Sequence, residues 1–104
     1  MTGDDPLLGA LASARERKQQ ADREIRLLLA FAREISTPRP YRLADLAHAA
    51  GMSISGVRVA YTKGDIQQAA GLTGACQRRH VEAVVMALLA TRQNAPAREH
   101  DTAA

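Results

Sequence analysis

The sequence predicts an all-α protein, and three observations support this. Apolar or small residues recur at spacings of three and four, no stretch alternates apolar and polar residues as a strand does, and proline occurs only at positions 6, 38, 40 and 96. The predicted order is a long N-terminal helix, a helix-turn-helix, and then one short and one longer C-terminal helix. The chain has 104 residues and only three aromatics. Such a core is thin, so we expect a helical dimer.

The first element is one long helix over about Leu7–Ser36, or two helices if Gly9 breaks it near the start, within an N-terminal arm or dimerisation region at 1–36. Asp5 followed by Pro6 is typical of a helix start, a capping side chain and then a residue with preset φ. A heptad-like stripe follows, in which Lys18 occupies one place and the others are Leu11, Ala14, Ala21, Ile25, Leu28, Ala32 and Ile35. Apolar residues also lie off the stripe, at Leu27, Leu29 and Phe31. The C-terminal half of this helix must therefore be packed on at least two sides.

Charged residues dominate Arg15–Arg26 in the middle of this helix. One interpretation is a solvated face with pairs such as Glu16 with Gln20 and Asp22 with Arg26. The other is an arm that reaches a partner subunit or the DNA backbone. The first interpretation is favoured.

Thr37–Pro40 breaks the helix, and Leu43–Thr62 then fits a helix-turn-helix within a segment at 37–64. Ala47, Gly51 and Val57 occupy the fifth, ninth and fifteenth places of this window. The fifth place needs a small side chain because the second helix crosses there. The ninth needs a residue that tolerates positive φ, and the fifteenth a branched apolar residue in the seam. These three residues are the structural positions of the motif.

The motif divides into a helix at Leu43–Ala50, a turn at Gly51-Met52 and a second helix capped by Ser53. Arg42 stands where a capping Ser or Thr is usual, and Gly56 weakens the second helix. The side chains that project from the seam are Ser53, Ile54, Ser55, Arg58, Val59 and Thr62. This is the face that a recognition helix offers to the major groove of DNA.

Specific contacts follow from the chemistry of that face. Arg58 is its one long hydrogen-bonding side chain, so we expect it to bind a guanine edge bidentately. Ile54 and Val59 suit thymine methyls, and the short hydroxyl side chains suit close contacts. Phosphate contacts are expected from the flanking cations, which are Arg39, Arg42 and Lys63.

Lys63-Gly64 is expected to end the second helix, with Gly64 in the left-handed closing conformation. Asp65 is then expected to cap a short helix at Ile66–Ala70. A last helix is expected from about Thr73 to Arg92, and these two helices form a core or dimerisation region at 65–94. Asn94-Ala95-Pro96 stops the last helix, and a polar tail at 95–104 is expected to be disordered.

The segment from Arg39 to Thr62 resembles the helix-turn-helix of bacterial transcription regulators. Small DNA-binding proteins of actinobacteria are most similar to this segment, which contains the sequence RPYRLADLAHAAGMSISGVRVAY. Arg42 in the capping position and Gly56 depart from the commonest pattern. The resemblance implies sequence-specific binding to double-stranded DNA, usually by a dimer. It implies a regulator of transcription, with repression favoured over a role in plasmid partition or replication.

Charge placement agrees with this interpretation. The net charge is +3 and the pI about 9.6. Between Pro38 and Gly64 the single carboxylate, Asp45, stands against four cations. The alternative is a protein-interaction module, in which a sigma-factor-like helix-turn-helix docks on another protein. That alternative requires a larger apolar patch than Ile54 and Val59 provide.

Catalysis is not expected, because the sequence has no nucleophile–base set, phosphate loop or dinucleotide fingerprint. Cys76 and His80 are four apart, but two ligands are too few for a metal site. We therefore expect no cofactor, no metal and no small-molecule effector. A single cysteine and no signal peptide suggest a cytoplasmic, nucleoid-associated protein that makes no membrane contact. One such module reads few base pairs, so we expect a homodimer with recognition helices about 34 Å apart.

Overall fold

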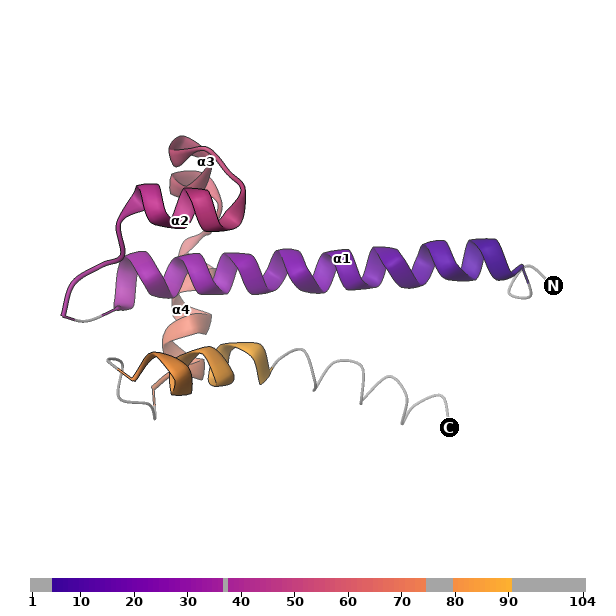
Figure 1. The fold of residues 1–104 in the computed structure, drawn as a ribbon. Coiled ribbons are helices and arrows are strands. Elements are labelled where there is room, and N and C mark those ends of the chain that lie inside the picture. The colour runs from indigo at the N-terminus through magenta and orange to yellow at the C-terminus, as the bar shows by residue number, and fades with distance from the viewer. Residues whose placement is uncertain (1–4, 37, 75–79, 91–104) are drawn as a thin grey trace.

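The computed structural model describes residues 5–36, 38–74 and 80–90, and within these ranges the regular structure is entirely helical. Helix α1 (Pro6–Ala30) continues into one π-helical turn, η2 (Phe31–Ile35). Three shorter helices follow, α2 (Leu43–Ala50), α3 (Ile54–Val59) and α4 (Lys63–Leu72), and residues 81–90 are helical as well. The short elements gather around one end of α1 (Figure 1). The all-α prediction is confirmed.

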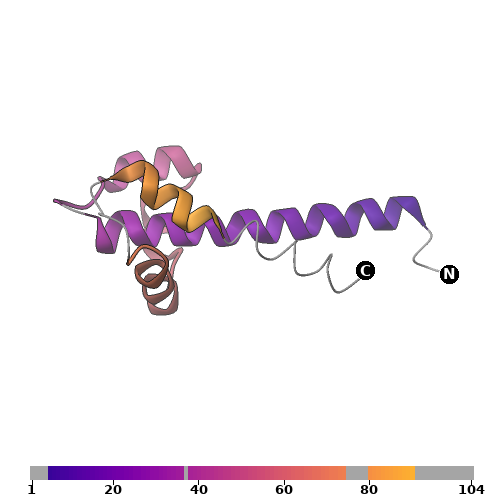
Figure 2. The same ribbon diagram turned by 90° about the horizontal axis from the view of Figure 1, so that it is seen from below.

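The start of α1 is as the sequence predicts. The Oδ1 atom of Asp5 accepts hydrogen bonds from the backbone N–H groups of Leu7 at 2.9 Å and Leu8 at 3.3 Å, and Pro6 opens the helix. The first half of α1 then extends away from the other described helices (Figures 1 and 2). Every residue from 5 to 19 is exposed. The radius of gyration is 16.2 Å, against about 13 Å for a compact chain of this length. We call residues 6–19 the arm.

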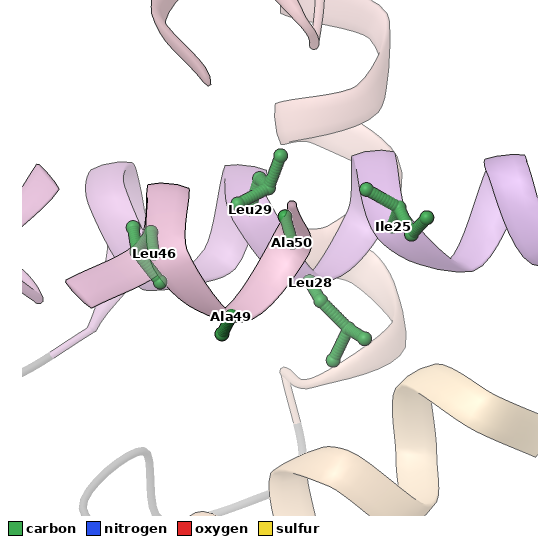
Figure 3. A pocket seen from close by; sticks show the side chains of 6 residues that line it. All are labelled: Ile25, Leu28, Leu29, Leu46, Ala49 and Ala50. Atoms are coloured by element: carbon green, nitrogen blue, oxygen red, sulfur yellow. The ribbon is translucent and has the colours of Figure 1, made fainter. Parts of the chain in front are cut away.

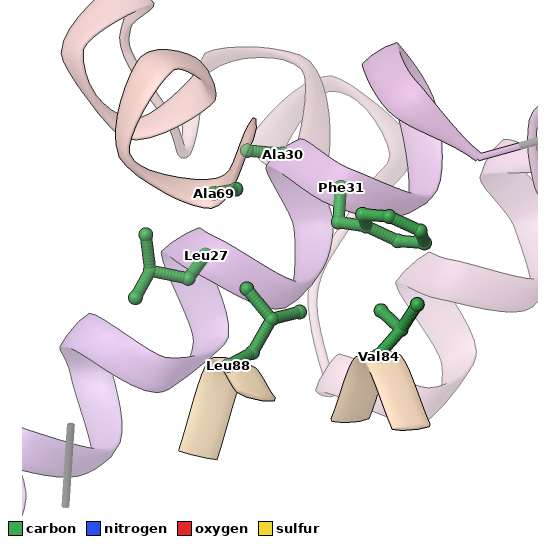
Figure 4. Packing of buried hydrophobic residues seen from close by; sticks show 6 residues of the cluster. All are labelled: Leu27, Ala30, Phe31, Ala69, Val84 and Leu88. Atoms are coloured by element: carbon green, nitrogen blue, oxygen red, sulfur yellow. The ribbon is translucent and has the colours of Figure 1, made fainter. Parts of the chain in front are cut away.

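The second half of α1 is packed on two sides, which confirms that expectation. On one side Leu27 and Phe31 lie in a buried cluster with Ala69 of α4 and with Val84 and Leu88 (Figure 4). On another side Leu29 forms a second buried cluster with Ala47 of α2 and Val57 of α3. The second half of α1 therefore contributes to two buried clusters, one that packs α4 and residues 81–90 against it and one that packs the α2–α3 pair against it.

The end of α1 widens into η2, which sequence periodicity does not predict. The N–H of Ser36 donates to the carbonyl of Phe31 at 2.9 Å, a five-residue step typical of a π turn. The carbonyl of Ala32 instead accepts from the N–H of Tyr41 at 3.0 Å. Arg33 Nη1 also donates to the carbonyl of Tyr41 at 2.7 Å. These bonds hold the chain against α1 directly before α2 begins.

The predicted boundary after α3 is wrong. Helix α3 ends at Val59, and Thr62 is the N-cap of α4. The N–H of Asp65 donates to Thr62 Oγ1 at 3.2 Å, and the N–H of Thr62 donates to Asp65 Oδ2 at 3.0 Å. This reciprocal capping box places Lys63 and Gly64 in the first turn of α4. Gly64 therefore lacks the positive φ that was expected of it, since among the described residues Gly51 alone has one.

The C-terminal predictions also need correction. Helix α4 continues through Gly71 to Leu72, and Asp65 lies inside its first turn rather than before it. Thr73 is the C-cap of α4, fully buried, and its Oγ1 donates to the carbonyl of Ala69 at 2.8 Å. It therefore does not begin the last helix. Of that predicted helix, 75–79 and 91–92 lie outside the described residues, as do the stop at 94–96 and the tail.

The charged middle of α1 forms different ion pairs from those expected. Asp22 pairs with Lys18 at 3.9 Å, whereas Arg26 Nε lies 3.6 Å from Asp65 Oδ2. The predicted pair of Asp22 with Arg26 is therefore wrong, because Arg26 turns toward α4. As a solvent-accessible pair, Arg26–Asp65 contributes little stability, about 0–1 kcal/mol.

Candidate nucleic-acid interface

A left-handed glycine joins α2 to α3. Gly51 has φ 69° and ψ 34° and is the C-cap of α2. Its N–H donates to the carbonyl of His48 at 3.3 Å, and the N–H of Met52 donates to the carbonyl of Ala47 at 2.9 Å. A residue with a Cβ is strained at this φ. The expectation of a positive-φ glycine in this turn is confirmed.

The seam between α2 and α3 is buried where the sequence predicts. Val57 is fully buried and Ala47 is 6% exposed, and both contact Leu29 of α1. The half-buried side chains around this cluster include Leu46, Met52 and Ala60. Because Val57 points toward α1, the opposite side of α3 is turned to solvent.

Ser53 caps α3 and explains the neighbouring glycine. Its Oγ accepts from the N–H of Gly56 at 2.9 Å and lies 3.4 Å from Ser55 Oγ. A Cβ on residue 56 would come within 3.0 Å of Ser53 Oγ and 3.5 Å of Met52 Cε. The close approach that Gly56 permits is thus to its own capping turn and not to another helix.

The outward face of α3 is exposed and carries one cation. Val59 is 81% exposed and Ile54 is 44% exposed; Ser55 and Arg58 are also exposed. In the described part of the chain, Arg58 forms no ion pair. Thr62 is exposed too, but it caps α4 and does not belong to this helix. Five of the six predicted base-contact residues therefore lie within Ser53–Val59, and Thr62 lies outside α3.

The other predicted cations flank this unit from neighbouring segments. Arg42 is the N-cap of α2 and makes no side-chain capping bond, so its guanidinium is exposed at the helix entrance. Arg39 is exposed in the preceding segment, where its carbonyl accepts from Ser36 Oγ at 3.1 Å. Lys63 is the first residue of α4 rather than the last of α3. The carboxylate of Asp45 lies in the first turn of α2 and is also exposed.

Sequence reasoning missed Tyr61, which fastens the end of α3 to α1. Its Oη donates to Glu34 Oε2 at 2.7 Å, and its ring packs against both buried clusters. Burial, the hydrogen bond to Glu34 and the charge of that carboxylate together raise the pKa of Tyr61 to about 12, against a smaller lowering by the charge of Arg33. A tyrosine between two short helices was the available signal, but its partner is 27 residues away.

This contact predicts a loss of stability at high pH. The pKa of Tyr61 is higher in the folded chain than its ordinary value of 10, so folding favours the protonated phenol. The contribution is complete below pH 10 and is lost as pH rises to about 12. Urea unfolding at several pH values should show that Tyr61→Phe removes this part of the decline. An absorbance titration should lose its latest tyrosine step in Tyr61→Phe and keep it in Tyr41→Phe. Loss of that step in Tyr41→Phe instead would contradict the assignment.

Comparisons with protein-family models, curated proteins and solved structures find no match to this chain. No helix in the described ranges is long and apolar enough to cross a membrane. Among residues 5–36, 38–74 and 80–90, no group of three or more His, Cys, Asp or Glu side chains is placed to hold a metal ion. Cys76, half of the weak metal pattern, lies outside the described residues. The function must therefore be inferred from the α2–α3 unit, residues 43–59.

Proposed function

We propose that the α2–α3 unit is a helix-turn-helix that binds double-stranded DNA, and that the protein is a dimeric regulator of transcription. The observation that carries this proposal is the burial of Val57 against α1. Because Val57 is buried against α1, the face of α3 with Ile54, Arg58 and Val59 is turned outward. An exposed, largely uncharged helix face flanked by cations suits the major groove.

The proposed contacts are the predicted ones, with one exception. Arg58 binds a guanine edge, and Ile54 and Val59 contact thymine methyls. Ser53 and Ser55 lie at the start of α3, and their short side chains suit close contacts with DNA. Ser53 Oγ also caps the helix. Thr62 is dropped as a base contact because it lies outside α3, as the N-cap of α4.

Phosphate contacts are proposed for Arg39, Arg42 and Lys63. Arg42 and Arg39 precede α2, the helix that crosses the DNA backbone in this kind of motif. Lys63 is separated from the end of α3 by three residues and lies in the first turn of α4, where backbone amides also favour an anion. Contacts of this kind set orientation without reading sequence.

The test is a titration of the full chain against genomic fragments at two salt concentrations. We expect binding that prefers some fragments and weakens steeply as salt rises, since each neutralised phosphate releases counterions. Salt-dependent binding without fragment preference would contradict sequence-specific recognition. Absence of binding would favour the alternative, a helix-turn-helix that docks on a protein, although the exposed apolar residues on α3 are limited to Ile54 and Val59.

Two alanine variants should distinguish the base contact proposed for Arg58 from the phosphate contact proposed for Arg42. Arg58→Ala is expected to reduce discrimination at one base pair by about 1–3 kcal/mol. Arg42→Ala is expected to weaken all sequences about equally and to lower the salt slope by roughly one unit. Competition binding with single-base variants of the preferred fragment measures both effects. An unchanged preference in Arg58→Ala would show that α3 does not read bases through this side chain.

A further inference from the structure

The arm carries apolar side chains that nothing in the described chain covers. Leu7 is 75% exposed, Leu11 65% and Leu8 53%. The heptad-like stripe begins at Leu11 and continues through Ala14 and Ala21 toward the body, and Leu7 lies one turn before it on the same face. Leucines spaced by four on one face of a long helix are typical of a surface that packs on another helix.

The same stripe runs into an apolar groove at the other end of α1. The groove has a volume of about 190 Å³ and lies between α1 and α2 (Figure 3). Its lining consists of Ile25, Leu28, Leu29, Leu46, Ala49 and Ala50. A second depression of similar size adjoins it, shares Leu28 and Leu46, and is closed on its far side by residues of the segment 81–90.

We propose that two copies of this chain pair through antiparallel α1 helices, with the arm leucines of each copy in the groove of the other. The stripe is self-complementary in this orientation. Leu11 then lies opposite Leu28 of the second copy, Ala14 opposite Ile25, and Lys18 opposite Ala21 near the two-fold axis. Leu11 of the arm thus meets the groove, and at the centre Lys18 lies against the small side chain of Ala21.

Charges beside the stripe support the antiparallel orientation. Arg15 and Asp22 lie on the same flank of α1, one heptad apart, and both are exposed. In an antiparallel pair, equivalent flanks face each other, so Arg15 of each copy faces Asp22 of the other. In a parallel pair the two Lys18 side chains would instead face each other in the stripe, and their like charges would repel. The single lysine in the stripe, Lys18, favours one register over shifted ones.

The pairing rests on the arm and groove alone, so it is tested without DNA. Sedimentation velocity of the full chain at micromolar concentration should show a dimer. Leu11→Glu should weaken its association on the order of 100-fold or more, because each dimer buries two of these side chains. Leu11 is 65% exposed in the single chain, so circular dichroism should show retained helix content.

Ala12→Glu is the matched control, because Ala12 lies on the same exposed arm but away from the stripe. It should remain a dimer. A monomeric parent chain would overturn the proposal, as would equal association of the two variants. Either result would overturn the pairing through α1 and would not bear on whether α3 binds DNA.

Orientation is tested by disulfide cross-linking in a Cys76→Ser background. In a mixture of Ala14→Cys and Ile25→Cys chains, oxidation should link the two kinds of chain, since these positions face each other. Two copies of Ala14→Cys alone should not link, because antiparallel helices hold them about 16 Å apart. Efficient linkage of Ala14→Cys to itself would overturn the antiparallel arrangement.

Charge reversal gives an independent check. Arg15→Asp and Asp22→Arg should each weaken association several-fold, and the double variant should restore it, because the opposite charges then meet again. Double-variant association as weak as that of the single variants would contradict the proposed pairing.

Discussion

Replacing Val57 by Asp is expected to destabilise the protein by at least about 3 kcal/mol, whereas the same replacement at Val59 should change stability by no more than about 0.5 kcal/mol. Val57 is fully buried in the cluster with Ala47 and Leu29, but Val59 is 81% exposed. A carboxylate at position 57 loses its water without gaining a partner. At position 59 it remains solvated, and only a β-branched side chain is lost from a short helix.

Urea unfolding followed by far-ultraviolet circular dichroism measures this difference. The same pair of variants also separates folding from the proposed function. A negative charge at position 59 would lie on the proposed DNA-binding face, so Val59→Asp should fold normally and bind DNA weakly because it repels phosphates. Equal destabilisation by the two variants would show that the outward and inward faces of α3 are wrongly assigned. Normal DNA affinity in Val59→Asp would move the binding surface elsewhere.

Truncating Leu27 to Ala should lower the free energy of unfolding by about 2–5 kcal/mol. Leu27 is fully buried, and its cluster joins α1 to α4 and to residues 81–90 through Ala69, Val84 and Leu88 (Figure 4). Removal of its methyl groups leaves a cavity between α1, α4 and residues 81–90. Such a loss is a large share of the 5–15 kcal/mol that stabilises a typical domain.

Met86→Ala is the control, since Met86 is 74% exposed. It should change stability by about 0.5 kcal/mol or less. The two variants are compared by urea unfolding at one protein concentration, because dimer formation would make stability depend on concentration. An effect of Leu27→Ala below about 1 kcal/mol would mean that this cluster does not hold the fold together.

Local signals predict the helices that depend on local bonds. The start of α1 follows from Asp5-Pro6, and the turn after α2 follows from Gly51, since each works through its own neighbours. The boundary between α3 and α4 is harder, because two local signals compete there. Lys63-Gly64 is typical of a helix end, but Thr62 and Asp65 form a capping box that begins a helix.

The site is predictable only in part for a similar reason. The inward positions Ala47 and Val57 follow from steric rules for two crossing helices, so the outward face follows from them. The bond from Tyr61 to Glu34 joins residues 27 apart. The groove requires α1 and α2 to be assembled first, and the adjoining depression also requires residues 81–90. No local pattern specifies such contacts. The π turn η2 is likewise fixed by its bonds to the segment before α2.

The uninterrupted course of α1 has a mechanical consequence. One continuous helix runs from the arm to Leu29, which seats the α2–α3 unit. A helix of 25 residues is about 37 Å long and resists bending. In a dimer of the proposed kind, α1 therefore fixes the distance between the dimer contact and the α2–α3 unit. The separation and rotational phase of the two reading faces are set by the number of residues between the arm and Leu29, and not by a flexible linker.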